Sequence, residues 1–406
     1  MDKKKKVIFL VGVCSLVFLV GLFFFIRDYR IRHAKIIVNL VDSLETEFLS
    51  EIKVSDFISY INGEIVDDYV IDTTEVGNKN ISFSYINEEK IKVKYTYEIS
   101  VVDRTAPVVW LSGSYTVKVG SEDTLTKKIL CGDNYDDSPV CEIIGDYNLN
   151  EANIYPLLFR ATDSSGNVTE KKFNLKVIAP SSSNGSSNNS GGSTPKVTTD
   201  FQDVIQNYKT DNTEIGLDIS HHQGDVDFQK LKQAGVEFVF IRVGRTKGIG
   251  GEYVLDTKFL QNIEEAEKYG IPVGIYFYSY ANSKEAAIAD ANWVLEQIKD
   301  KKVDLPIAFD WENWNTYNNF GLSFFGLSTM ANEFLNVFKE QGYDGVVYSS
   351  KNYLESIWME LDYPVWLAHY VKNTNYEGEF LYWQLCSNGR VDGINGDVDI
   401  DIRYKK

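Results

Sequence analysis

The chain has 406 residues, enough for two or three domains, and 44% of them are apolar, which excludes a globally disordered protein. The formal net charge is -17 at pH 7, so the chain lacks the excess of Lys and Arg that gives nucleic-acid-binding proteins most of their affinity, and we exclude nucleic acid as a partner. Aromatic residues make up 14% of the chain, which leaves rings available to stack on a ligand.

The N-terminus predicts a membrane anchor. "MDKKKK" at 1–6 precedes an apolar run at 7–26, and about 20 helical residues span the roughly 30 Å hydrocarbon core of a bilayer. The charged "RDYRIR" follows without a small-residue cleavage site, so we expect an uncleaved transmembrane helix and not a signal peptide. The lipid bilayer is then a partner, 1–6 is a cytoplasmic tail, and the rest of the chain lies outside the cell.

Residues 36–178 predict two all-β sandwich modules, at 36–103 and 104–178. Phe83–Val101 and Phe159–Val177 have the same spacing, and each brackets a polar turn followed by period-2 alternation, which is typical of a hairpin. Through "DRTAPVV" and "ATDSSGNV" the modules resemble the immunoglobulin-like repeats of bacterial surface proteins. That resemblance implies either binding to the cell wall or a spacer stalk.

The chain has four cysteines, without a CxxC motif and without paired Cys/His spacing, so we expect no zinc site. Cys131 and Cys141 lie ten residues apart in a loop-like segment. They form a disulfide if this region meets an oxidising compartment, and stay free thiols otherwise.

A Ser/Gly/Asn-rich linker is expected at 179–211, because its low-complexity part, 179–196, cannot bury a core. Beyond it, at 212–406, short apolar runs alternate with helical stretches. Repeated strand–helix units indicate a parallel sheet, and eight candidate strands indicate a barrel. About 195 residues is short for this fold. We therefore expect an irregular (β/α) TIM-like barrel whose last helices are missing or reduced.

Strand alternation sends several acids to one end of this barrel. In "PIAFDWEN", Phe309 and Trp311 point one way, while Asp310 and Glu312 point the other. The same argument places Asp218 inside, together with one of the last aspartates, of which Asp399 fits best. Acids are costly to bury, so we expect them at the C-terminal mouth, where barrel enzymes carry out their chemistry.

Crowded carboxylates push their pKa values apart, which suits the acid and the anion of glycoside hydrolysis. Two alternatives stay open: a solvated strand end, and a calcium or magnesium site. The sequence contains no HExxH motif for a metal, no G-x-S-x-G motif for a nucleophile triad and no phosphate-loop motif, so we expect no cofactor and no metal.

Six motifs, in this order, resemble glycoside hydrolase family 25, the N-acetylmuramidase-type lysozymes, over about 214–404. They are "GLDISHHQGDVDF", "FVFIRVGR", "GIYFYSYA", "IAFDWEN", "VWLAHY" and "YWQLCSNGRVDGINGDVDID". The resemblance implies cleavage of the β-1,4 bond between N-acetylmuramic acid and N-acetylglucosamine in peptidoglycan. By position, Glu312 would be the general acid and Asp310 would support the substrate's 2-acetamido group, with Asp218 and Asp399 completing the cluster. Departures at Phe277, at Cys386 and in the closing "DID" remove no acid.

Several side chains fit a sugar groove. Alternation leaves open whether Gln384 or Trp383 faces into the barrel, and it assigns Trp311 to the core. The expected substrate-binding residues are Tyr276, Tyr278, Tyr280, Trp314, Tyr348, Trp366, Tyr370 and Gln384. The sequence therefore predicts a multidomain, membrane-anchored muramidase that remodels or lyses the cell wall, and the alternative is a non-catalytic peptidoglycan-binding surface protein.

Overall fold

The computed structural model describes residues 3–179 and 197–405, with side chains described from Ser15 onward. The chain divides into two compact units, Met1–Arg104 and Thr105–Lys406. Much of the predicted linker, 180–196, lies outside the described residues. The described part of that linker contains strand β13 (Thr199–Asp200) and helix α3 (Phe201–Tyr208), so regular structure begins before the predicted boundary at 212.

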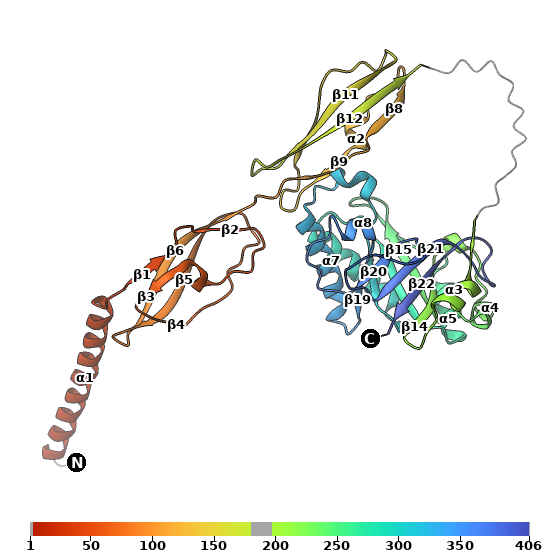
Figure 1. Cartoon of the computed structure of the whole chain (residues 1–406). Helices are drawn as coiled ribbons and strands as arrows, with labels where there is room; N and C mark the ends of the chain where they lie inside the picture. The colour runs from red at the N-terminus through yellow and green to blue at the C-terminus, as the bar shows by residue number, and fades with distance from the viewer. Residues whose placement is uncertain (1–2, 180–196, 406) are drawn as a thin grey trace, which may run out of the picture. The chain divides into compact units, whose positions relative to one another are not determined.

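Helix α1 (Lys3–Arg32) opens the first unit (Figure 1). Among its described side chains, an exposed apolar run at 16–26 is followed by a segment at 27–32 that carries Arg and Asp. In the described part of the chain, no helix is both long enough and apolar enough to cross a membrane. The predicted transmembrane anchor at 7–26 is therefore corrected, and the bilayer is no longer supported as a partner.

The rest of the first unit is a β module built around a long antiparallel hairpin. Strands β5 and β6 form the hairpin, and β2 adds to its edge in parallel orientation. Phe83, Tyr85 and Tyr97 from the hairpin are buried in the module's core. The elements are β1 (Val38–Leu40), β2 (Glu45–Glu47), the 3-10 helix η1 (Val54–Phe57), β3 (Ile58–Ile61), β4 (Gly63–Ile65), β5 (Gly77–Asn87) and β6 (Lys92–Val102).

The second unit begins with a β module of similar plan. Strands β11 and β12 form its long hairpin, and β8 joins β12 in parallel orientation. The structure thus contains a hairpin at each of the two segments that share a spacing in the sequence. The elements are β7 (Val108–Trp110), β8 (Ser114–Lys118), α2 (Leu125–Lys128), β9 (Leu130–Gly132), β10 (Val140–Ile144), β11 (Asn153–Thr162) and β12 (Val168–Ile178).

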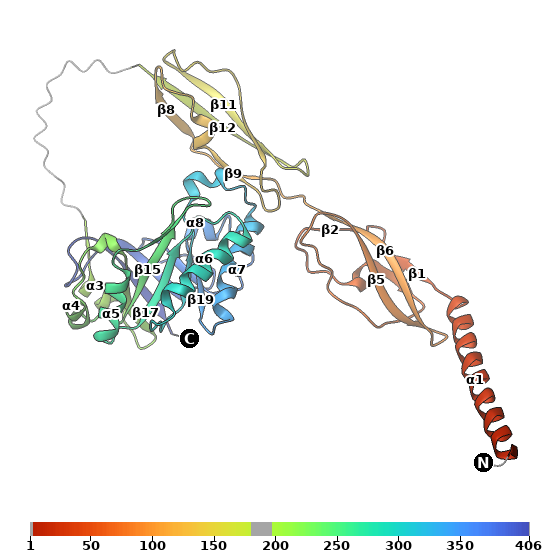
Figure 2. The same cartoon turned by 180° about the vertical axis from the view of Figure 1, so that it is seen from behind.

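A closed sheet forms the C-terminal part of the second unit. Its parallel strands are hydrogen-bonded to one another in the order β14-β15-β17-β18-β19-β20-β21. Strand β22 pairs antiparallel with both β14 and β21, and this pairing closes the barrel. Figure 2 shows the same sheet from behind. The strands are β14 (Thr213–Ile219), β15 (Phe238–Thr246), β16 (Tyr253–Leu255), β17 (Val273–Tyr278), β18 (Ile307–Asp310), β19 (Gly345–Ser350), β20 (Val365–Ala368), β21 (Tyr382–Arg390) and β22 (Val398–Tyr404).

The predicted fold class needs a second correction, because an irregular (β/α) TIM-like barrel was expected and this domain is a β-rich, barrel-like fold in which sheet dominates over helix. Among the described residues of this domain, helices of ten or more residues are α5 (Phe259–Lys268), α6 (Lys284–Ile298) and α7 (Phe324–Lys339), which follow β16, β17 and β18. After β19 the only described helix is the four-residue α8. Besides α3, the other described helices of the domain are α4 (Phe228–Ala234) and α8 (Lys351–Leu354), with 3-10 helices η2 (His221–Gln223) and η3 (Trp314–Asn319).

Two separate apolar layers fix which side chains reach the barrel interior. Phe309 and Trp311 belong to the layer between sheet and helices. Ala308 belongs to the layer inside the barrel, with Phe240 and Trp366. Because successive strand residues alternate between the two layers, Asp310 projects into the barrel interior, at the C-terminal end of β18.

Candidate active site

A pocket of about 390 Å³ lies at the C-terminal ends of the parallel strands and gathers the predicted acids. Asp218 comes from β14, Asp310 from the last position of β18, and Glu312 follows two residues later. Asp399 lies directly opposite Asp218 in the antiparallel pairing of β14 with β22. All four carboxylates line the pocket, so the structure brings together the acidic cluster that the sequence predicts.

The acids differ in their access to solvent. Asp310 is 4% exposed and Asp218 is 7% exposed, whereas the Glu312 side chain is open to solvent. Burial and then the charge of Glu312 raise the pKa of Asp310 well above its usual range. Burial of the carboxyl group by the surrounding protein also raises the pKa of Glu312. Burial, with the Glu312 charge, raises the pKa of Asp399 to about 6.

A further aspartate, Asp401, lies behind this cluster and is fully buried. Its Oδ1 accepts a hydrogen bond of 2.8 Å from the indole Nε1 of Trp366. Burial, followed by the charge of Asp399, raises its pKa. The strand alternation that places Asp399 inside the barrel also places Asp401 there, so Asp401 could have been predicted from the sequence.

Gln384 connects three walls of the pocket. Its Nε2 donates to Asp218 Oδ2 at 2.7 Å, and its Oε1 accepts from the hydroxyls of Tyr348 at 2.9 Å and Tyr370 at 2.8 Å. Trp383 faces the outer layer, where its Nε1 donates to the His369 carbonyl. The structure thus resolves the alternative that strand alternation left open.

The predicted aromatic residues divide into two groups. Trp314 is 6% exposed and stacks on Tyr353 with ring centroids 3.9 Å apart, so it is a core residue and not a sugar platform. Tyr280 packs on Tyr278 and lies outside the pocket lining. Both lie beyond the end of a strand, where alternation no longer fixes direction. The aromatic residues that do line the pocket are Tyr276, Tyr278, Tyr348, Trp366 and Tyr370.

Sequence reasoning missed a cationic wall of the pocket. Arg242 lines the pocket, and its Nε and Nη2 donate to Asp256 Oδ2 at 2.9 and 2.8 Å. Burial opposes the charge of Asp256, but hydrogen bonds from Lys258, His221 and Arg242 together lower its pKa. Alternation with Phe238 and Phe240 could have marked Arg242 as inward. No local pattern marks Asp256, whose role depends on the tertiary fold.

Ser220, His222 and Gln223 also line the pocket and were not predicted. They belong to the turn after β14, where the Ser220 hydroxyl accepts a hydrogen bond from the His222 amide at 3.3 Å. Within the described residues, none of the pocket acids belongs to a group whose ligand atoms converge on one metal position.

The segment carrying Asp310 and Glu312 is held by the end of β17. The Ser279 amide donates to the Asp310 carbonyl at 2.8 Å, and Asn313 Nδ2 donates to the Ser279 carbonyl at 3.0 Å. The Ser279 hydroxyl in turn donates to Asp290 Oδ2 at 2.6 Å. A buried carboxylate on α6 therefore supports the backbone on which the acids are mounted.

Asp290→Asn is expected to stabilise the barrel at neutral pH. Burial raises the pKa of Asp290 to about 6 from 3.8, so the folded chain binds this proton more tightly than the unfolded chain. Stability therefore falls as pH rises from about 4 to about 6, and the charged carboxylate costs up to about 3 kcal/mol above that window. Asn removes the charge and keeps an acceptor for Ser279. We expect a gain on the order of 1–3 kcal/mol at pH 7.5 and none below pH 4, measured by denaturant unfolding.

Glu296→Gln is the matched control, because Glu296 is an exposed acid on the same helix. It should unfold like the wild type at both pH values. A destabilised Asp290→Asn variant at pH 7.5 would contradict the assigned cost of the buried charge.

Residues 217–394 match the model of the family described as glycosyl hydrolases family 25. The autolytic lysozyme of Clostridium acetobutylicum is 29% identical over 189 residues, which are 46% of this chain and 54% of that protein. Lysozyme M1 of Streptomyces globisporus is 29% identical over 199 residues, or 45% of this chain and 65% of that protein. This chain thus covers less than two thirds of the length of either relative.

Among solved structures, the modular autolysin LytC of Streptococcus pneumoniae, in complex with a synthetic peptidoglycan ligand, is 25% identical. The match covers 61% of this chain and 56% of LytC, with a TM-score of 0.43. The spore cortex lytic enzyme SleM of Clostridium perfringens is 19% identical over 49% of this chain and 69% of that chain, also with a TM-score of 0.43.

Proposed function

We propose that residues 217–394, which match the family model, form a domain of glycoside hydrolase family 25, and that the protein is a peptidoglycan hydrolase of the muramidase type. Its substrate is the glycan strand, and the bond cut is the β-1,4 linkage between N-acetylmuramic acid and N-acetylglucosamine. One observation carries the proposal: a buried Asp310 stands beside a solvent-open Glu312 in a pocket walled by tyrosines. This pairing supplies the two carboxyl groups in different environments that glycoside hydrolysis requires.

Glu312 is assigned as the general acid, because it is the more exposed residue of the pair and its raised pKa keeps the carboxyl protonated to higher pH than in an ordinary glutamic acid. Asp310 is assigned to hold the substrate's 2-acetamido group. The acetamido oxygen attacks the anomeric carbon as the glycosidic C–O bond breaks and Glu312 protonates the departing oxygen. Water then opens the cyclic intermediate, Glu312 takes a proton from that water, and the configuration is retained.

The remaining pocket groups have supporting assignments. Gln384 fixes Asp218 and offers hydrogen bonds to sugar hydroxyls, while Tyr276, Tyr348 and Trp366 form an apolar wall for the pyranose rings. The Cys131–Cys141 disulfide supports a further proposal, that the protein acts outside the cytoplasm, because such bonds persist in oxidising compartments. Cell-wall remodelling or lysis is the process this activity would serve.

Mass spectrometry of digested peptidoglycan tests the proposal. Purified wall material is treated with the protein and then reduced with borohydride. We expect every new reducing end to be muramic acid, and therefore to appear as muramitol. New ends that appear as glucosaminitol would assign the chain to the other glycosidic bond. Binding to the wall without released products would favour the non-catalytic alternative.

A further inference from the structure

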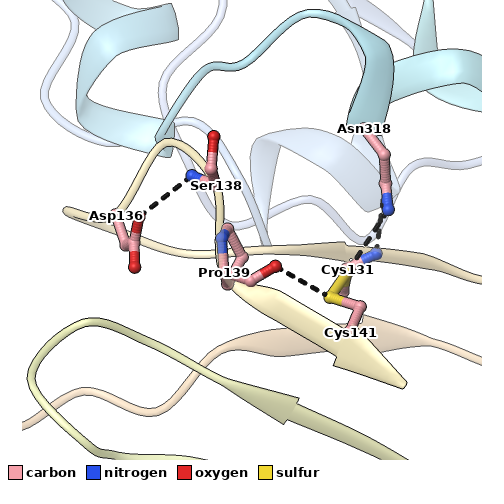
Figure 3. Close-up of a disulfide and its surroundings, with 6 residues drawn as sticks. All are labelled: Cys131, Asp136, Ser138, Pro139, Cys141 and Asn318. Carbon is pink, nitrogen blue, oxygen red and sulfur yellow. Dashed lines mark hydrogen bonds between the residues drawn. A yellow bond between two sulfur atoms is a disulfide. The ribbon is translucent and has the colours of Figure 1, made fainter. Parts of the chain in front are cut away.

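The second β module contacts the barrel directly beyond the catalytic segment, and both belong to the same compact unit. Asn318 of η3 reaches strand β9, where its Nδ2 donates to Cys131 Sγ at 3.3 Å and its Oδ1 accepts from the Cys131 amide at 3.3 Å. Figure 3 shows Asn318 pointing at the Cys131–Cys141 disulfide. The module therefore holds η3, which begins two residues after Glu312, by side chain and by backbone.

Backbone groups of the module also complete the start of α7. The first amides of any helix have no partner within the helix. Here the Phe324 amide donates to the Asp133 carbonyl at 2.8 Å, and the Phe325 amide donates to the Asn134 carbonyl at 3.1 Å. The N-terminus of a barrel helix thus depends on carbonyls from the β module.

An aromatic contact fills the space between these hydrogen bonds. The Trp110 ring lies 5.8 Å from that of Phe324 and 6.3 Å from that of Tyr317, measured between centroids. The approach requires a glycine at 132, because a Cβ there would lie 2.7 Å from the Phe324 ring and 2.8 Å from the Tyr317 ring. Neither ring is the free end of a flexible side chain, so a larger residue must push the two surfaces apart.

A short chain of packed rings leads from this contact to the acids. Tyr317 packs on Trp311 with centroids 6.0 Å apart. Trp311 is fully buried, and its Nε1 donates to the Ala281 carbonyl at 3.1 Å. It is also the residue between Asp310 and Glu312, so a shift of the Trp311 backbone is transmitted directly to both acids.

We propose that the second β module is a positioning element for Glu312: docked on η3 and α7, it fixes the carboxylate through Tyr317 and Trp311. The module touches neither substrate nor reacting atoms. This inference rests on the proposed function for its effect on turnover, but the docking itself does not depend on that function.

Gly132→Val in the full-length protein tests the proposal, with Gly113→Val as its matched control. Gly113 lies in the same module, and a Cβ there meets nothing within 4 Å. Since a misplacement of about 1 Å can cost up to about 100-fold in rate, we expect Gly132→Val to lower kcat by roughly 10- to 100-fold and to change KM by less than about 2-fold. Hydrogen exchange at the Phe324 and Phe325 amides should become faster. Gly113→Val should match the wild type in every readout.

Asn318→Leu is the second variant, made from the barrel side at an exposed position, should Gly132→Val fail to fold. It removes both hydrogen bonds to Cys131 and should also lower kcat, by a smaller factor.

An unchanged kcat with faster exchange would show that docking does not position Glu312. Unchanged exchange would show that the module does not hold α7. Either outcome overturns the proposal. An inactive wild type that still protects these amides would instead refute the proposed function alone.

Discussion

Glu312→Gln is expected to lower kcat on peptidoglycan by about 10²- to 10⁴-fold, the usual contribution of a general acid. Gln has nearly the same shape and keeps hydrogen-bonding capacity, but it has no proton to give to the departing oxygen. KM should change little, because the tyrosine wall and Gln384 remain in place. The measurement is the rate of release of reducing sugars from purified peptidoglycan.

An activated aryl glycoside serves as the control for this prediction. Its leaving group departs as a stable anion and needs no proton, so Glu312→Gln should retain most of the rate of aryl-group release in the first turnover, before Glu312 is needed as the base that activates water. Comparable losses on both substrates would mean that Glu312 has another role. Undiminished release of sugars from peptidoglycan would remove Glu312 from the mechanism altogether.

The pH dependence follows from the same assignment. Because the surrounding protein raises the pKa of Glu312, the protonated form that acts as the acid persists to higher pH than for an ordinary glutamic acid. Activity on peptidoglycan should therefore decline on the alkaline side as Glu312 loses its proton, and the aryl glycoside should not show this decline.

Strand alternation predicted most of the pocket because the acids lie on or next to strands. Asp218, Asp310 and Asp399 occupy strand positions whose neighbours are buried in the outer layer, so their direction follows from a period of two. The same rule, applied to "FVFIRVGR", would have included Arg242. The rule could not decide Gln384, because both faces of β21 are lined by large buried residues.

Alternation failed where the backbone leaves the strand. Trp314 and Tyr280 follow β18 and β17, and their directions depend on turns that the sequence pattern does not encode. Asp256 is brought to Arg242 by the antiparallel pairing of the short strand β16 with β15, a pairing that was not predicted from the sequence. The domain's length of about 195 residues predicted the short connections after β19. It did not predict how strongly sheet dominates this domain.

The interface between η3 and the β module had no sequence signal either. Asn318 and Cys131 are 187 residues apart, and neither belongs to a periodic pattern. The resemblance of the β modules to immunoglobulin-like repeats predicts a wall-binding or spacer element, and it gives no information about contacts with the barrel. A positioning role depends on Gly132, whose missing side chain matters only where Phe324 and Tyr317 approach it.

Asp310→Asn is expected to lower kcat by about 10²- to 10³-fold on peptidoglycan and, unlike Glu312→Gln, by a similar factor on the activated glycoside. The reason is that Asp310 acts on the attacking acetamido group and not on the leaving group. Asn can still hydrogen-bond, but unlike Asp310 it has no ionised form to stabilise the positive charge that spreads over the acetamido group and the anomeric carbon. At 4% exposure, little solvent screens this interaction.

A de-N-acetylated glycan completes the test of Asp310 as a double-mutant cycle. Removing the acetyl group from the substrate should slow the wild type strongly. If Asp310 acts through that group, Asp310→Asn should then cost almost nothing more, so the two losses should be far from additive. Additive losses would show that Asp310 works independently of the acetamido group, and this outcome would favour a water nucleophile and inversion of configuration.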